Sequence, residues 1–262
     1  MNRNPGDVFC YRRGSDVHPR QLVLQDAVRG HAFPPATATM KLTTEEGRRW
    51  YALLSQARRY LEWGAGGTTV VAAWRATHPS FPALEAHTIE SDETFLSQLR
   101  SSTPQIVEAE AAGSLRIRRP NLDPLGKWAM PANWSSREPA TRKRQSADYV
   151  QRLPTGGCCF DFILIDGRFR QACLLQALRL SHDHTTVILH DFYSMTGPRP
   201  HMFGAGKKHR ARYNYTASRW YEHVQRVDTL TVLRPRRGAV EAAKQGSAGF
   251  EEQMRMVLED YA

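Results

Sequence analysis

Four short apolar segments constrain the fold of this chain most. They lie at residues 60–63, 86–90, 160–165 and 185–189, and each ends in glycine or polar residues followed by helix-type sequence. Largely continuous apolar runs are typical of strands buried on both faces, and strands that alternate with helices form a mostly parallel sheet. The sequence therefore predicts an α/β fold with a doubly wound sheet and helices on both faces.

The chain divides into three parts. Residues 1–40 predict an irregular arm, residues 41–237 one α/β domain, and residues 238–262 a C-terminal helix. Within the domain, residues 120–145 carry four prolines and two tryptophans, which indicates an irregular insertion. Near its end, residues 224–233 predict an antiparallel hairpin.

Local signals also predict where helices begin. Thr43 followed three residues later by Glu46 is the pattern of a capping box, so a helix is expected from about Thr44. Asp92 is placed to cap a helix that starts at Glu93. A further short helix is expected over residues 147–153.

Composition narrows the class of protein. The chain has 262 residues, of which 41% are hydrophobic, and a formal net charge of +10. No apolar run approaches the roughly 20 residues that cross a bilayer, so we expect no membrane span. The four cysteines form no Cys-x-x-Cys pair, which favours reduced thiols in an intracellular, cytoplasmic protein over a disulfide framework or a zinc site.

Positive charge is concentrated in two loop-rich segments. Residues 116–144 contain eight Lys or Arg against two acidic residues, and residues 199–237 contain ten against two. Such segments bind nucleic acid, anionic lipid or an acidic small molecule, or simply keep a protein soluble. The basic run 207–212, followed by Tyr213 and Tyr215, suits either nucleic-acid binding or a lid over an anionic substrate.

A glycine loop, EWGAGGTT at residues 62–69, follows the first apolar segment. Gly64 and Gly66 lack a Cβ, so the backbone can turn tightly and approach a ligand closely. Thr68 and Thr69 can cap the following helix, whose first amides carry partial positive charge. Alone, the loop is also compatible with an ordinary strand-to-helix turn.

Two carboxylates narrow the identity of the expected ligand. Glu90, at the end of the next strand, can accept hydrogen bonds from ribose hydroxyls. The dinucleotide pattern Gly-x-Gly-x-x-Gly fails because Thr69 stands at its third glycine. Glu62, two residues before the first glycine, suits the cationic end of S-adenosylmethionine, directly or through water, better than a pyrophosphate. NAD is therefore the weaker alternative.

The motifs occur in a characteristic order: YLEWGAGGTT at residues 60–69, IESD at 89–92, DFILIDG at 161–167 and VILHD at 187–191. Together they resemble class I S-adenosylmethionine-dependent methyltransferases, most closely the branch of catechol-type and macrocin-type O-methyltransferases. The resemblance covers about residues 40–235. It implies a Rossmann-like sheet and S-adenosylmethionine as cofactor.

The resemblance also implies which residues bind that cofactor. Glu62, Gly64 and Gly66 would line its methionine end, Glu90 would hold the ribose, and Asn121 would lie near the adenine. The full set expected at the cofactor is Glu62, Gly64, Ala65, Gly66, Thr68, Glu90, Ser91, Asn121 and Asp166.

Asp166 and Asp191 end strands that are expected to be neighbours, so their carboxylates could converge. Two carboxylates with water and substrate oxygens suit a hard divalent ion such as Mg²⁺. Catechol-type enzymes place Asn after the second Asp, whereas this chain has Phe192 there. The alternatives are a helix cap for Asp166 and a hydrogen bond to loop amides for Asp191.

Methyl transfer needs an acceptor lone pair in line with the sulfonium and often a base that removes a proton. His190 is the candidate base, and with Asp166 and Asp191 it forms the expected catalytic set. His201 and His209 are alternatives.

The favoured function is methylation of a hydroxyl or carboxyl oxygen on a small anionic acceptor. Arg168 and Arg170 follow Asp166-Gly167 at the start of a helix, and one of them could pair with Asp166 or grip that acceptor. Residues 166–169 lack the Asn/Asp-Pro-Pro-Tyr pattern of enzymes that methylate base amines. Two alternatives stay open: an RNA- or protein-directed methyltransferase that uses the basic loops, and a non-catalytic S-adenosylmethionine-binding scaffold.

Overall fold

The computed structural model describes residues 41–126, 129–151, 159–191 and 215–261. In these residues seven strands form one sheet in the order β3-β2-β1-β4-β5-β7-β6. The strands are β1 Arg59–Trp63, β2 Glu85–Ile89, β3 Leu115–Arg118, β4 Phe160–Ile165, β5 Ser181–Leu189, β6 Tyr221–Val227 and β7 Leu230–Pro235. Strands β1 to β5 pair in parallel, and β7 pairs antiparallel with both β5 and β6. The predicted fold class, a doubly wound, mostly parallel sheet with a closing antiparallel hairpin, is confirmed.

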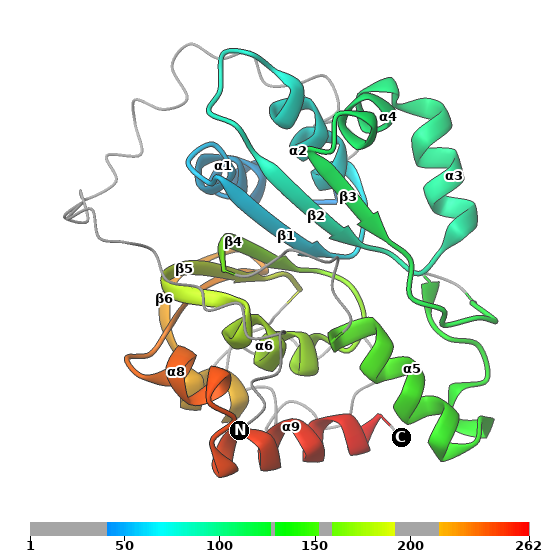
Figure 1. Cartoon of the computed structure of the whole chain (residues 1–262), viewed down its shortest axis with the longest axis vertical. Helices are drawn as coiled ribbons and strands as arrows, with labels where there is room; N and C mark the ends of the chain where they lie inside the picture. The colour runs from blue at the N-terminus through cyan, green and yellow to red at the C-terminus, as the bar shows by residue number, and fades with distance from the viewer. Residues whose placement is uncertain (1–40, 127–128, 152–158, 192–214, 262) are drawn as a thin grey trace, which may run out of the picture.

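Helices cover both faces of the sheet (Figure 1). They are α1 Thr44–Leu54, α2 Gly67–Thr77, α3 Glu93–Ser102, α4 Pro104–Ala111, α5 Pro139–Gln151, α6 Arg170–Arg179, α8 Ala239–Lys244 and α9 Ala248–Asp260, with a 3₁₀ turn at Trp134–Ser136. Helices α1, α2 and α4 enclose one buried cluster, which includes Trp50 and Val71. Helices α5, α6, α8 and α9 enclose the other, which includes Trp63 and Phe250.

Two predicted helix starts are confirmed in atomic detail. The Thr43 hydroxyl accepts from the Glu46 amide, and the Glu46 carboxylate accepts from the Thr43 amide, which completes the capping box of α1. The Asp92 carboxylate accepts from the Phe95 amide at 3.0 Å and caps α3. Each cap satisfies a helix amide that has no partner within its helix.

Other boundaries differ from the prediction. Helix α5 begins at Pro139 rather than near residue 147, so the irregular insertion is shorter than expected. Proline is favoured in the first turn of a helix because its missing N–H has no helical partner there anyway. The expected single C-terminal helix is two, α8 and α9, separated by Gly246, whose φ of +64° lies in the left-handed region. Tyr221 opens β6, so the hairpin begins earlier than residue 224.

The strand order reverses direction between β1 and β4, which places their carboxyl ends side by side at the middle of the sheet. In doubly wound folds, ligands bind in the crevice outside the carboxyl ends at this point. No helix among the described residues is long and apolar enough to span a membrane.

Candidate active site

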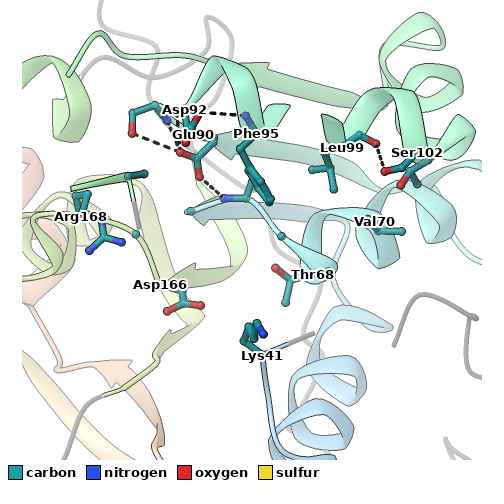
Figure 2. A pocket seen from close by; sticks show the side chains of 18 of the residues that line it. Lys41, Thr68, Val70, Glu90, Asp92, Phe95, Leu99, Ser102, Asp166 and Arg168 are labelled. Carbon is teal, nitrogen blue, oxygen red and sulfur yellow. Dashed lines mark hydrogen bonds between the residues drawn. The ribbon is translucent and has the colours of Figure 1, made fainter. Parts of the chain in front are cut away.

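A cavity of about 800 Å³ opens at this point of strand reversal. Figure 2 shows it between the glycine loop, the end of β2 and the segment after β4. Its lining includes seven of the predicted site residues: Gly64, Ala65, Gly66, Thr68, Glu90, Ser91 and Asp166. The volume falls within the range of about 300–1,000 Å³ that is usual for small-molecule sites.

Gly64 and Gly167 bring the two central strands into backbone contact. Gly64 has a φ of +98°, and a Cβ on it would lie 2.9 Å from the Gly167 nitrogen. A Cβ on Gly167 would lie 2.0 Å from the Tyr149 hydroxyl. Both positions therefore require glycine for the fold itself, apart from any ligand.

Gly66 differs from these two positions. Its φ of 174° is extended backbone, and a Cβ built on it meets nothing within 4 Å. Because Gly66 lines the cavity, the free space beside it is space that a ligand can fill. Its amide donates to the Thr69 hydroxyl at 2.9 Å, which fixes the loop from below.

The placement of Glu62 corrects the sequence prediction. Its side chain is fully buried and does not line the cavity. Its two oxygens accept hydrogen bonds from four hydroxyl groups, those of Tyr60, Thr68, Thr69 and Thr88. The carboxylate therefore lies under the glycine loop and ties it to β1 and β2, and it is not one of the groups that line the cavity.

This burial has an electrostatic consequence. Removal from water raises the pKa of Glu62 to about 7, although the surrounding hydroxyl donors act in the opposite direction. The two threonines expected to cap α2 take part in this buried network, because both hydroxyls donate to Glu62.

Glu90 lies where the sequence predicts it, at the end of β2 and on the cavity wall. One carboxylate oxygen accepts from the amides of Ser91 and Asp92, at 2.6 and 2.9 Å. The other accepts from the Ala65 amide in the glycine loop, at 3.0 Å. These bonds fix the carboxylate beside the cavity, and Figure 2 shows them as dashed lines.

Asn121 is not among the residues that line the cavity. It is exposed, and its side-chain oxygen accepts from the Asp123 amide in a local turn. From the region of the insertion, the lining instead includes Gly126 and Ala129, with Tyr149 from α5. Asn121 therefore lies outside the lining of the cavity, and its expected position near the adenine stays a prediction.

The predicted catalytic residues do come together. Asp166, His190 and Asp191 each offer one side-chain atom that could bind a metal ion, and these atoms all lie within 4.8 Å of one another. The His190 Nδ1 atom is 2.9 Å from Asp166 Oδ1, and its Nε2 atom is 3.6 Å from the buried carboxylate of Glu46. Of the three predicted residues, Asp166 lines the cavity, whereas His190 and Asp191 contact the cluster without being among the lining residues.

Charge shifts the ionisation of this cluster. Burial alone would raise the pKa of Asp166, but the neighbouring His190 and Arg170 outweigh it and lower that pKa. Burial would likewise lower the pKa of His190, but Asp166, Asp191 and Glu46 outweigh it and raise that pKa.

Two of the described residues that line the cavity are basic, and neither belongs to the expected cofactor set. Lys41, just before α1, lines the cavity, and Figure 2 shows it below Thr68 and Asp166. Arg168, which the sequence suggests as a partner of Asp166 or as a grip for the substrate, lies on the wall that also holds Asp166. Sequence reasoning missed Lys41 because no motif or periodic pattern surrounds this residue.

The opposite side of the cavity carries apolar side chains. The apolar side chains in the lining are Leu42, Val70, Trp74, Phe95 and Leu99. Figure 2 shows Val70, Phe95 and Leu99 on the side away from Arg168 and Asp166, together with the polar Ser102. His201, His209 and the basic run 207–212 lie outside the described residues.

No protein-family model matches the sequence, and no curated protein sequence matches it. Solved structures do resemble it. A methyltransferase-like protein from Silicibacter pomeroyi gives a TM-score of 0.58 at 19% identity, over 84% of this chain and 96% of that chain. TrmN from Thermus thermophilus gives 0.42 at 16% identity, over 77% of this chain and 51% of that chain. A TehB-like S-adenosylmethionine-dependent methyltransferase from Corynebacterium glutamicum gives 0.35 at 11% identity, over 68% and 80%.

At such identities the likeness shows the fold alone, and it rests on the first of these structures. The chain therefore has the α/β fold of a methyltransferase-like protein.

Proposed function

We propose that this chain is an S-adenosylmethionine-dependent methyltransferase that acts on an oxygen atom of a small anionic acceptor. The observation that carries the proposal is the pairing of Gly66 and Glu90 across one cavity. Gly66 leaves open space in front of the loop, and the Glu90 carboxylate is fixed beside it by three amides. A nucleoside with a charged tail fits such a site by its chemistry.

In this proposal Glu90 accepts hydrogen bonds from the ribose hydroxyls, as carboxylates at the end of the second strand do in nucleotide-binding sheets. Ser91 lies beside Glu90 on the cavity wall and extends this side of the site. Lys41 lies near the glycine loop and supplies a positive charge for the cofactor's carboxylate. Ala65 and Thr68 complete the wall along the loop.

The cofactor supplies an electrophilic methyl group on a sulfonium. When bound, it would supply this methyl group to the acceptor oxygen and leave as S-adenosylhomocysteine, and a hydroxyl acceptor would also give up its proton. Asp166 lines the cavity and can accept a hydrogen bond from that hydroxyl. The Nδ1 atom of His190 lies 2.9 Å from Oδ1 of Asp166, so the pair can take the proton together.

In this proposal Arg168 binds the negatively charged group of the acceptor. Its guanidinium lies on the same wall as Asp166, which would hold an anionic group close to the reacting oxygen. Arginine suits this task because its planar donors match carboxylate and phosphate. The apolar wall opposite would take a hydrocarbon portion of the ligands.

The test is release of S-adenosylhomocysteine in the presence of acceptor pools grouped by charge and by oxygen type. We expect turnover with an anionic hydroxyl or carboxyl pool, and a product that carries an O-methyl group. Arg168→Gln should lower kcat/KM for that acceptor by about 10-fold or more, with an unchanged Kd for the cofactor. Arg255→Gln, on the exposed face of α9, is the matched control.

Other outcomes would contradict the proposal in distinct ways. Methylation of RNA together with salt-sensitive RNA retention would assign the enzyme to a macromolecular acceptor. Cofactor binding without transfer to any pool would indicate a scaffold.

A further inference from the structure

Asp166, His190 and Asp191 have the donor types of a divalent cation site, two carboxylates and one imidazole. Whether these three side chains bind a metal ion depends on which groups their oxygen and nitrogen atoms already contact. Among the described residues, the cation in contact with both carboxylates is Arg170, a partly buried side chain in the first turn of α6.

The Arg170 guanidinium is fixed between the ends of β4 and β5. Its Nε donates to the Gly167 carbonyl and its Nη2 to the Asp166 carbonyl, both at 3.0 Å. Its Nη1 donates to the His190 carbonyl. Three backbone carbonyls from two strand ends therefore hold one side chain that is 13% exposed.

The same guanidinium also contacts both carboxylates. Arg170 Nη2 lies 2.9 Å from Asp166 Oδ1, and Nη1 lies 3.8 Å from Asp191 Oδ2. The Asp166 Oδ1 atom is in addition 2.9 Å from His190 Nδ1. One oxygen of the pair is thus already shared by two nitrogen groups, and the other carboxylate faces a fixed positive charge.

A divalent ion bound by Asp166 and Asp191 would lie within a few ångströms of this guanidinium. Like charges at that separation repel strongly where water is scarce. Arg170 cannot lose its proton to relieve the repulsion, because arginine stays charged in proteins. It also cannot swing away without leaving the three carbonyls that it satisfies.

We propose that Arg170 is the resident cation of the Asp166–Asp191 pair, in the place that a divalent metal would otherwise take. It neutralises the two carboxylates, joins the ends of β4 and β5, and holds Asp166 at the cavity wall. The cluster is therefore metal-independent. This inference concerns cation binding and does not depend on which molecule is methylated.

The test is a titration of the whole chain with Mn²⁺, without cofactor or acceptor, in which electron paramagnetic resonance measures the free and bound ion. We expect no saturable binding by the wild-type protein up to millimolar Mn²⁺. Arg170→Gln removes the charge but keeps hydrogen-bonding groups, and it should bind Mn²⁺ at least about 10-fold more tightly than Arg170→Lys. Arg170→Lys keeps the charge and is the matched control.

Adding Asp191→Asn to Arg170→Gln should abolish the gained binding, which would locate the ion at this pair. Saturable binding of one Mn²⁺ by the wild-type protein, lost in Asp191→Asn, would overturn the proposal. So would a folded Arg170→Gln protein that binds no more Mn²⁺ than Arg170→Lys. The wild-type titration decides the matter even if a variant fails to fold, and failure to find a methyl acceptor would leave it unaffected.

Discussion

The buried carboxylate of Glu62 gives a stability prediction whose size follows from the structure. Glu62 is fully buried under the glycine loop, and its pKa in the folded chain is about 7 rather than 4.5. That difference corresponds to about 3 kcal/mol between the protonated and ionised forms. Glu62→Gln keeps the size of the side chain and removes its ability to ionise.

The direction follows from the raised pKa. Below pH 4.5 the carboxyl is protonated in both the folded and the unfolded chain, so its ionisation does not oppose folding. Between pH 4.5 and 7 the unfolded chain loses the proton more readily, and the free energy of unfolding falls. Above pH 7 both states are ionised and the loss of about 3 kcal/mol is complete.

The assay is urea unfolding of wild type and Glu62→Gln at pH 4.5, 6 and 8. We expect the variant to gain about 3 kcal/mol relative to wild type between the lowest and highest pH. Other titrating groups cancel in this difference. Glu45→Gln, an exposed glutamate on α1, is the control. A difference that stays constant across the range would refute the assigned burial of Glu62.

Three further predictions concern other carboxylates and the cavity lysine. Burial acts to raise the pKa of Asp161, but His182 and the amides of Arg58 and Arg59 outweigh it and lower that pKa to about 2. The ionised form therefore stabilises the fold above pH 3.8, and this stabilisation is lost as the pH falls through 2. Asp161→Asn should therefore lower the free energy of unfolding by about 2 kcal/mol at pH 7, and a difference undiminished near pH 2 would contradict this. Glu90→Gln should weaken S-adenosylmethionine binding by about 10- to 100-fold in calorimetry, and an unchanged Kd would exclude its contact with ribose. Lys41→Met should weaken S-adenosylmethionine binding by about 5-fold or more but leave methylthioadenosine, which lacks the carboxylate, unaffected; equal losses for both would contradict the assigned contact.

Features with local causes could be predicted from the sequence. The capping box of Thr43 and Glu46 and the Asp92 cap depend on residues three apart, and both form as expected. The alternation of apolar strands with helices predicted the mostly parallel, doubly wound sheet. Gly66 and Glu90 reach the cavity because strand ends in such a sheet meet at one edge.

Features that depend on the assembled fold could not be predicted in this way. The burial of Glu62 depends on hydroxyls from two strands and a helix, of which Thr88 is 26 residues away. The insertion that contains Asn121 has no periodicity from which its direction could be read. The sequence predicts that Arg168 or Arg170 could pair with Asp166, but the bond from Arg170 to the His190 carbonyl requires the neighbouring strand to be in place.

The central claim is that the cavity in front of Gly66 binds S-adenosylmethionine. Isothermal titration of wild type, Gly66→Ala and Gly66→Leu tests it most directly, because the extended backbone and open space at Gly66 allow a side chain without disturbing the fold. We expect one cofactor per wild-type chain, a graded loss that reaches about 30-fold or more in Gly66→Leu, and unchanged thermal unfolding in both variants. No binding by wild type, or equal affinity in wild type and Gly66→Leu, would contradict the account.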